Sequence, residues 1–178
     1  MSLNLPERIE TARLVLTRLQ PEDAEEIFYT YASKPQATRY MAWPTHQSIR
    51  DTRQFLTYAD RGWRNGTDYS FSIRLATNRR LVGSCGMIHQ EGKIQFGYVI
   101  GPVHWRMGYA TEATLAMLDQ VKNSEEVYRI HTFIDTENTA SINVVKKCGL
   151  VVEARLEKWF RFPNQNNVPK DCFVFILR

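Results

Sequence analysis

"GYVIGPVHWRMGYATEA", residues 97–113, is the stretch that decides the fold of this chain. An apolar strand pattern ends at Ile100, a loop follows, and a helical pattern starts directly after Gly108. The inward face of that helix is formed by residues with three- and four-residue spacing, namely Ala110, Ala113, Met117 and Val121. The stretch therefore predicts a strand, a tight loop and a packed helix.

The loop before this helix has the features of an anion site. The first amides of a helix have no acceptor within the helix, and they carry the positive end of its dipole. Gly108 leaves space for a group to approach the backbone, and Arg106 adds a positive charge beside it. These features predict a site for a phosphate or pyrophosphate. The alternative interpretation is a tight turn that requires glycine at a positive φ angle.

A second stretch, "NTASINVVKKCGL" at residues 138–150, combines polar and apolar residues on one helical face. Val145 and Cys148 point inward with Asn138 and Ser141, because the four share that face. An amide and a hydroxyl that point inward need hydrogen-bond partners. Two interpretations remain open: the polar pair caps its own helix, or it contacts a ligand between the helix and the preceding strand.

The remaining pattern predicts a mixed α/β sheet. Alternating or apolar runs at 13–19, 69–76, 81–90, 94–100, 127–134, 150–160 and 171–177 predict about seven strands, and the middle three form an antiparallel meander. Helical patterns at 21–32, 48–64, 109–122 and 138–148 predict four helices. The length of 178 residues suits one domain spanning residues 1–178.

Composition excludes several classes of protein. No apolar run approaches the roughly 18 residues of a membrane span, and three cysteines without a CxxC pair argue for a reducing cytoplasm. The four histidines show no metal-ligand spacing, so no metal site is expected. The net charge of +4 suits an anionic ligand, but Lys and Arg are scattered, so no nucleic-acid or membrane partner is expected.

Together the two motifs resemble the GNAT superfamily of acetyl-CoA-dependent N-acetyltransferases. More narrowly, the chain is similar to the RimJ/RimL branch, the ribosomal-protein N-terminal acetyltransferases and their relatives. The segments "IETARLVLTRLQPEDAEEIF" at 9–28 and "ATRYMAWP" at 37–44 also fit that branch, so the resemblance covers nearly the whole chain. It implies mostly antiparallel strands with one splayed parallel pair, and acetyl-CoA as co-substrate.

The resemblance also implies roles for individual residues. The backbone of Tyr98, Val99 and Ile100 would pair with the pantetheine arm, and Asn138 would bond it. The pyrophosphate would lie on the amides of the loop and first helical turn, formed by Arg106, Met107, Gly108, Tyr109, Ala110 and Thr111. Ser141 would lie near the thioester sulfur. A neutral amine would attack the acetyl carbonyl directly.

Three departures from the family pattern bear on this assignment. Arg106 replaces the usual small residue after the motif's Trp, and Met107 replaces a basic or polar residue. Val145 stands where many members have a tyrosine acid, so Ser141 is the candidate that protonates the leaving thiolate, as proposed for the branch. The general base stays unassigned among a water chain, Glu10 and His131. Many relatives carry an acid at the position of Gln95, and some carry a Glu late in the penultimate strand, a few residues from Glu157. This chain has no acid at either of those two positions.

The acceptor pocket is expected between the N-terminal helices and the closing strands, where aromatic residues gather: Tyr40, Trp43, Tyr69, Phe71, Trp159 and Phe160. Aromatic walls suit a protein N-terminus or a modest apolar amine better than a polycation. The polar loop near residues 161–171 is expected to close over the acceptor or contact a partner chain, and the protein is expected to be a monomer or homodimer. Two alternatives are a catalytically silent acetyl-CoA-binding module of the same fold and an unrelated α/β phosphate-binding protein.

Overall fold

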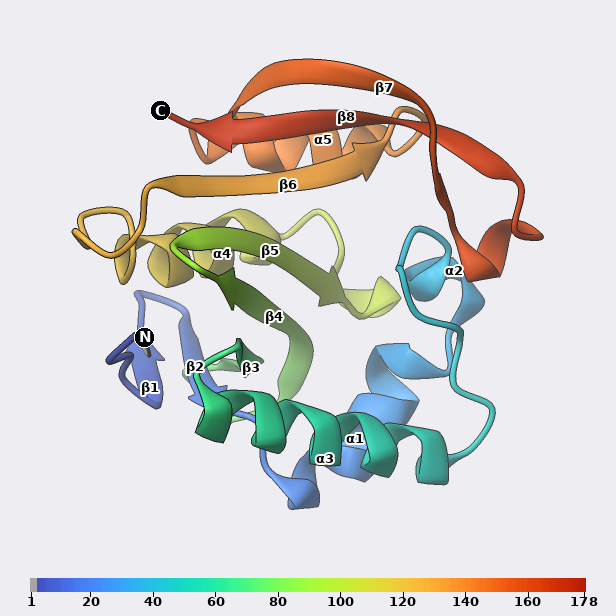
Figure 1. The fold of residues 1–178 in the computed structure, drawn as a ribbon. Helices are drawn as coiled ribbons and strands as arrows, with labels where there is room; N and C mark the ends of the chain where they lie inside the picture. Colours follow the sequence, from blue (N-terminus) through green and yellow to red (C-terminus); the bar gives the residue numbers. More distant parts are fainter. Residues whose placement is uncertain (1–2) are drawn as a thin grey trace.

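The computed structural model describes residues 3–178 of the chain. These residues form one eight-stranded sheet with helices on both of its faces (Figure 1). In spatial order β1-β2-β3-β4-β5-β6-β8-β7, the strands are Arg8–Glu10, Leu14–Arg18, Asp68–Leu75, Leu81–Gln90, Lys93–Ile100, Arg129–Asp135, Pro169–Leu177 and Val151–Arg161. The helices α1 to α5 are Ala24–Ile27, Pro35–Thr38, Ile49–Asn65, Tyr109–Asp119 and Thr139–Lys147. No helix of residues 3–178 is long and apolar enough to cross a membrane.

The predicted mixed α/β architecture is confirmed, with small differences in the number of elements. The three-residue strand β1 is the eighth strand where about seven were expected, and the short helix α2 is additional to the four expected helices. The segment 21–32 forms one helical run, in which a 3₁₀ turn, α1 and a π turn follow one another. The meander of β3, β4 and β5 is antiparallel, as predicted.

The strands β5 and β6 form the parallel pair of the sheet, and they pair over a short distance. Their register runs from Lys93 opposite Arg129 to Gln95 opposite His131. Directly beyond this ladder the Thr132 hydroxyl donates to the Phe96 carbonyl at 2.8 Å. Strand β5 continues to Ile100 and β6 continues to Asp135, but the two strands no longer pair with each other there. They therefore splay apart, as the resemblance implied.

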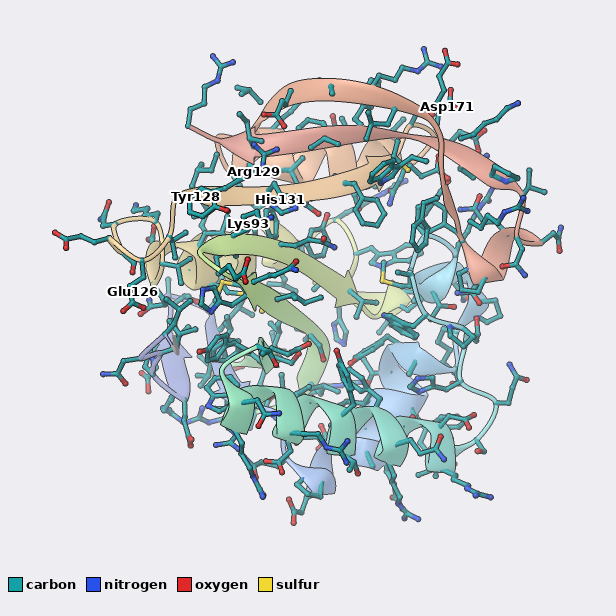
Figure 2. All side chains as sticks on the ribbon, in the orientation of Figure 1. Lys93, Glu126, Tyr128, Arg129, His131 and Asp171 are labelled. Carbon is teal, nitrogen blue, oxygen red and sulfur yellow. The ribbon has the colours of Figure 1, made fainter. Side chains whose placement is uncertain are left out.

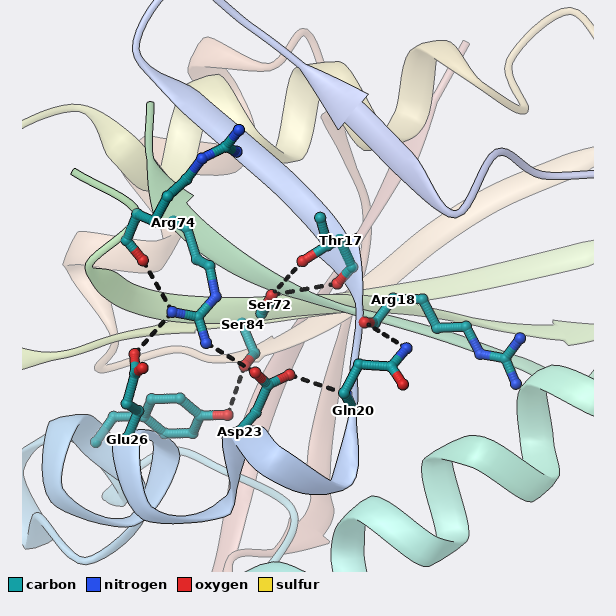
Figure 3. A network of polar contacts seen from close by, with 10 residues as sticks. Thr17, Arg18, Gln20, Asp23, Glu26, Ser72, Arg74 and Ser84 are labelled. Carbon is teal, nitrogen blue, oxygen red and sulfur yellow. Dashed lines mark hydrogen bonds and ion pairs between the residues drawn. The ribbon is translucent and has the colours of Figure 1, made fainter. Parts of the chain in front are cut away.

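Apolar side chains fill a core on each face of the sheet. On the α4 face Ala113, Met117 and Val121 are fully buried, as the helical pattern predicted. On the other face α1 and α3 contribute Ile27 and Leu56. Figure 3 shows a polar network that fixes the first helical run to β3, in which Arg74 pairs with Asp23 and Glu26, each at 2.7 Å.

Candidate functional site

A cavity of about 450 Å³ lies where β5 and β6 separate. Its lining residues come from both faces of the sheet. Tyr98 and the start of α5 line it on one face, and β3, β4, α3 and residues 40–46 line it on the other. None of the described residues that line it is Lys or Arg. The cavity therefore connects the two faces at the splayed strands.

The start of α4 presents backbone amides beside the loop that follows β5. Gly108 is the N-cap residue with φ of +78°, so the prediction of a glycine-dependent turn is confirmed. The first helical bond runs from the Glu112 amide to the Gly108 carbonyl. The amides of Tyr109, Ala110 and Thr111 consequently have no acceptor within the helix. Arg106, which also has a positive φ of 63°, is exposed beside them.

A turn between β1 and β2 braces this loop from outside. The Arg13 guanidinium donates to the Met107 carbonyl at 2.9 Å and to Glu112 at 2.7 Å. Glu112 also accepts from the Thr11 hydroxyl at 2.6 Å. Burial acts to raise the pKa of Glu112, but the bonds from Thr11 and Arg13 outweigh it, and the pKa is lowered. This brace was missed in the sequence, because its residues lie about a hundred positions apart.

Ser141 receives two hydrogen bonds at the start of α5. The Tyr98 hydroxyl and the Asn138 amide each donate to its oxygen at 3.1 Å. Asn138 also accepts from the Ser141 amide at 3.2 Å, so the capping interpretation is confirmed. Burial raises the pKa of Tyr98 to about 12, although its bond to Ser141 acts in the opposite direction. All three side chains line the cavity. Asn138 and Ser141 therefore cap the start of α5 and also face the space that a ligand would occupy.

Aromatic side chains line the cavity on the face of α3. Tyr40 and Trp43 lie there as expected, and Phe55 and Tyr58 of α3 join them. Asn164, in the loop between β7 and β8, holds this wall. Its amide donates to the Thr38 and Trp43 carbonyls at 2.7 and 2.9 Å, and its oxygen accepts from the Thr45 amide at 2.9 Å. The Asn164 side chain thus docks the loop against residues 38–45 on the acceptor side.

Other aromatic residues expected in this pocket lie elsewhere. Phe71 is fully buried in the core on the opposite face of β3, because side chains alternate along a strand. Tyr69 shares that face and is also buried. Trp159 lies on β7 with 54% of its surface exposed and does not line the cavity. Phe160 packs against Phe162, whose side chain does line it.

Comparison with known proteins identifies the family. Residues 13–151 match the family model described as an acetyltransferase (GNAT) domain. The chain belongs to the GNAT acetyltransferase family. The uncharacterized N-acetyltransferase p20 of Bacillus licheniformis is 30% identical over 156 residues, which are 86% of this chain and 87% of that protein.

Solved GNAT structures share the fold of this chain. Mycobacterium smegmatis RimJ, in complex with CoA-disulfide, superposes with a TM-score of 0.87 at 18% identity, over 99% of this chain and 90% of its own. The microcin C7 self-immunity acetyltransferase MccE, in complex with acetyl-CoA and AMP, gives 0.86 at 21% identity, over 98% and 97%. Acetyl-CoA is the co-substrate of GNAT acetyltransferases.

The candidate bases of this GNAT chain are not gathered in the cavity. Glu10 is exposed and pairs with Arg8, and neither it nor Glu157 lines the cavity. His131 lies at the paired end of β5 and β6 beside Lys93 and Arg129 (Figure 2). Burial, and then the Arg129 charge, lower the pKa of His131. Gln95 lines the cavity but has no proton-accepting carboxylate.

The structure adds carboxylates that the sequence did not single out. Asp68 and Asp135 are the acidic residues among the described lining residues, and no cluster of His, Cys, Asp or Glu in residues 3–178 has the arrangement of a metal site. Both oxygens of Asp135 are engaged, by the Glu137 amide at 2.9 Å and the Gln165 amide at 3.1 Å. The alternation of β3 carried the signal for Asp68, which shares the face of Ser70.

Proposed function

We propose that this chain is an N-acetyltransferase that transfers the acetyl group of acetyl-CoA to a primary amine, carried by a small molecule or a protein N-terminus. The observation that carries the proposal is the cavity at the splayed strands, which Tyr98 and the start of α5 line on one face and an aromatic wall lines on the other. The whole of residues 1–178 would act as one such domain. The two sequence motifs and the fold shared with RimJ support placement in the RimJ/RimL branch.

In this proposal the chain holds acetyl-CoA mainly through its backbone. After Gln95, β6 no longer covers the edge of β5. The pantetheine amides pair with the backbone of this free edge along Tyr98, Val99 and Ile100. The amides from Arg106 to Thr111 bind the pyrophosphate, since a helix start attracts anions. The Asn138 side chain bonds the pantetheine. Arg13 fixes the loop through the Met107 carbonyl and leaves its amides to face the ligand.

The chemical step uses few side chains. The cavity aligns a neutral amine with the acetyl carbonyl, so the nitrogen–carbon bond forms as the carbon–sulfur bond breaks. The proton that the reacting nitrogen loses passes to solvent water, while Ser141 gives its own proton to the departing thiolate and is reprotonated from solvent. The Ser141 oxygen accepts both of these hydrogen bonds, from Tyr98 and Asn138, which leaves its own hydrogen free to be donated.

Calorimetric titration with acetyl-CoA tests the cofactor site. The wild type is expected to bind in the micromolar range, and Gly108→Val is expected to lose at least tenfold in affinity. Valine is strained at a φ of +78°, and its Cβ would lie 3.3 Å from the Arg13 guanidinium. Val103→Ala, an exposed change in the same loop, is the matched control with unchanged affinity.

Release of free CoA thiol in the presence of amines and short peptides tests the transfer. Turnover with any primary amine, together with a mass increase of one acetyl group on that amine, supports the proposal. Tight acetyl-CoA binding without turnover of any amine would instead indicate the catalytically silent module. No binding to a folded wild type would overturn both functions.

A further inference from the structure

Asp68 lies on the sheet face that forms the floor of the acceptor side. The register of β3, β4 and β5 places Asp68 in a row with Ile88 and Gln95. The next row along the strands is Ser70, Gly86 and Gly97. Residues that pair across strands point to the same face. All six line the cavity, so both rows face it.

The glycines keep this floor open next to the splayed strands. A Cβ atom built on Gly97 would have no atom within 4 Å, and Gly97 is exposed to the cavity. Its neighbour Tyr98 points to the other face, where it reaches Ser141. An acceptor nitrogen above Gly97 therefore meets the gap between β5 and β6 from the side opposite Ser141.

The Asp68 carboxylate is available for a ligand. One of its oxygens accepts from the Ser70 hydroxyl at 2.5 Å, and the other has no hydrogen-bond partner in residues 3–178. Asp135, in contrast, has both oxygens engaged. No Lys or Arg within residues 3–178 lines the cavity, so no cationic side chain from this described part neutralises Asp68 there. Burial raises the pKa of Asp68, and the bond from Ser70 opposes that shift.

Asp68 is too far from Gly97 to take the proton of the reacting amine. Strand β4 separates their strands, and the two residues are offset by two positions. Adjacent strands lie about 4.8 Å apart and the offset adds about 6.7 Å along the strand, which gives a separation of about 12 Å. An unpaired carboxylate at that distance suits a second charged group of the same acceptor.

We infer that the preferred acceptor carries a second cationic group, an ammonium or guanidinium, which Asp68 holds while the primary amine reacts beside Gly97. This inference rests on the proposed acetyltransferase function. The aromatic wall complements it, because Phe55, Tyr58 and Trp43 suit the apolar chain between the two charges and favour a nearby cation. Asp68 is a specificity-determining residue and takes no part in proton transfer.

The test compares α,ω-diaminoalkanes of three to eight carbons with n-alkylamines of equal length. Steady-state kinetics of the wild type are expected to show at least tenfold higher kcat/KM for a diamine of matching length. Asp68→Asn is expected to raise KM for that diamine roughly 10- to 100-fold, with kcat and all alkylamine constants within about threefold. Asp68→Glu keeps the charge and is expected to retain part of the preference.

Asp119→Asn, a carboxylate-to-amide change on the exposed end of α4, is the matched control and keeps the diamine preference. Thermal unfolding and acetyl-CoA affinity establish that each variant is folded.

Equal losses for diamine and alkylamine in Asp68→Asn would make Asp68 structural and overturn the inference. Equal use of both amines by the wild type would overturn it while leaving the acetyltransferase function intact. No turnover of any amine would reject that function, and the inference with it.

Discussion

At the scale of single residues, the hydroxyl of Ser141 is the group whose chemistry the structure defines most closely. A serine hydroxyl has one hydrogen to donate and two acceptor positions. Tyr98 and Asn138 both donate to the Ser141 oxygen. Burial keeps Tyr98 protonated, because its pKa is raised to about 12. The arrangement therefore persists over the pH range of ordinary assays, and Ser141 keeps its proton available.

Ser141→Ala tests this arrangement. We expect kcat to fall about 100-fold, as for loss of a general acid, while the Kd for acetyl-CoA changes less than about threefold. Single-turnover kinetics and calorimetry measure the two quantities separately. Thr139→Ala is the matched control, since Thr139 is exposed on the same helix and does not line the cavity. Unchanged kcat in Ser141→Ala would reject the proton-donor role.

At the scale of elements, the loop between β7 and β8 holds the acceptor wall through Asn164. Asn164→Ala removes the bonds to Thr38, Trp43 and Thr45, at a cost of about 2–3 kcal/mol in unfolding free energy. We expect the acceptor KM to rise at least fivefold with the acetyl-CoA Kd unchanged, because the cofactor side keeps its contacts. Acceptor and cofactor titrations measure both. Val168→Ala, exposed in the same loop, is expected to behave as wild type.

The same elements show which parts of the site could be predicted from the sequence. Local patterns located α4, its glycine cap and the β3–β5 meander, since periodicity and backbone conformation are encoded by neighbouring residues. The alternation of β3 also carried the information that Phe71 faces away from Ser70. The Arg13–Glu112 and Asn164–Thr45 contacts join segments that are distant in sequence. No local pattern encodes such contacts, because they depend on how the elements pack.

At the scale of the whole molecule, both cores bury groups that ionise in the unfolded chain at alkaline pH. The three cysteines are free and buried. Burial raises the pKa of Cys148 and of Cys172 to about 11 from the ordinary value of 9.0. Burial also raises the pKa of Tyr98, to about 12 from 10.0. The folded chain therefore retains protons that the unfolded chain releases.

The sign of the resulting pH dependence follows from these raised pKa values. Below pH 9 the folded and the unfolded chain both hold the thiol protons, and the contribution of these groups to the unfolding free energy is fully present. Between pH 9 and about 11 only the folded state holds them, so the unfolding free energy falls by about 1.4 kcal/mol per pH unit for each such group. Urea unfolding at several pH values measures this slope. Cys148→Ala removes one of the groups that retain a proton in the folded chain. It is therefore expected to make the decrease in unfolding free energy shallower by nearly the contribution of one proton, about 1.4 kcal/mol per pH unit. An unchanged slope would mean that the Cys148 thiol ionises equally in both states.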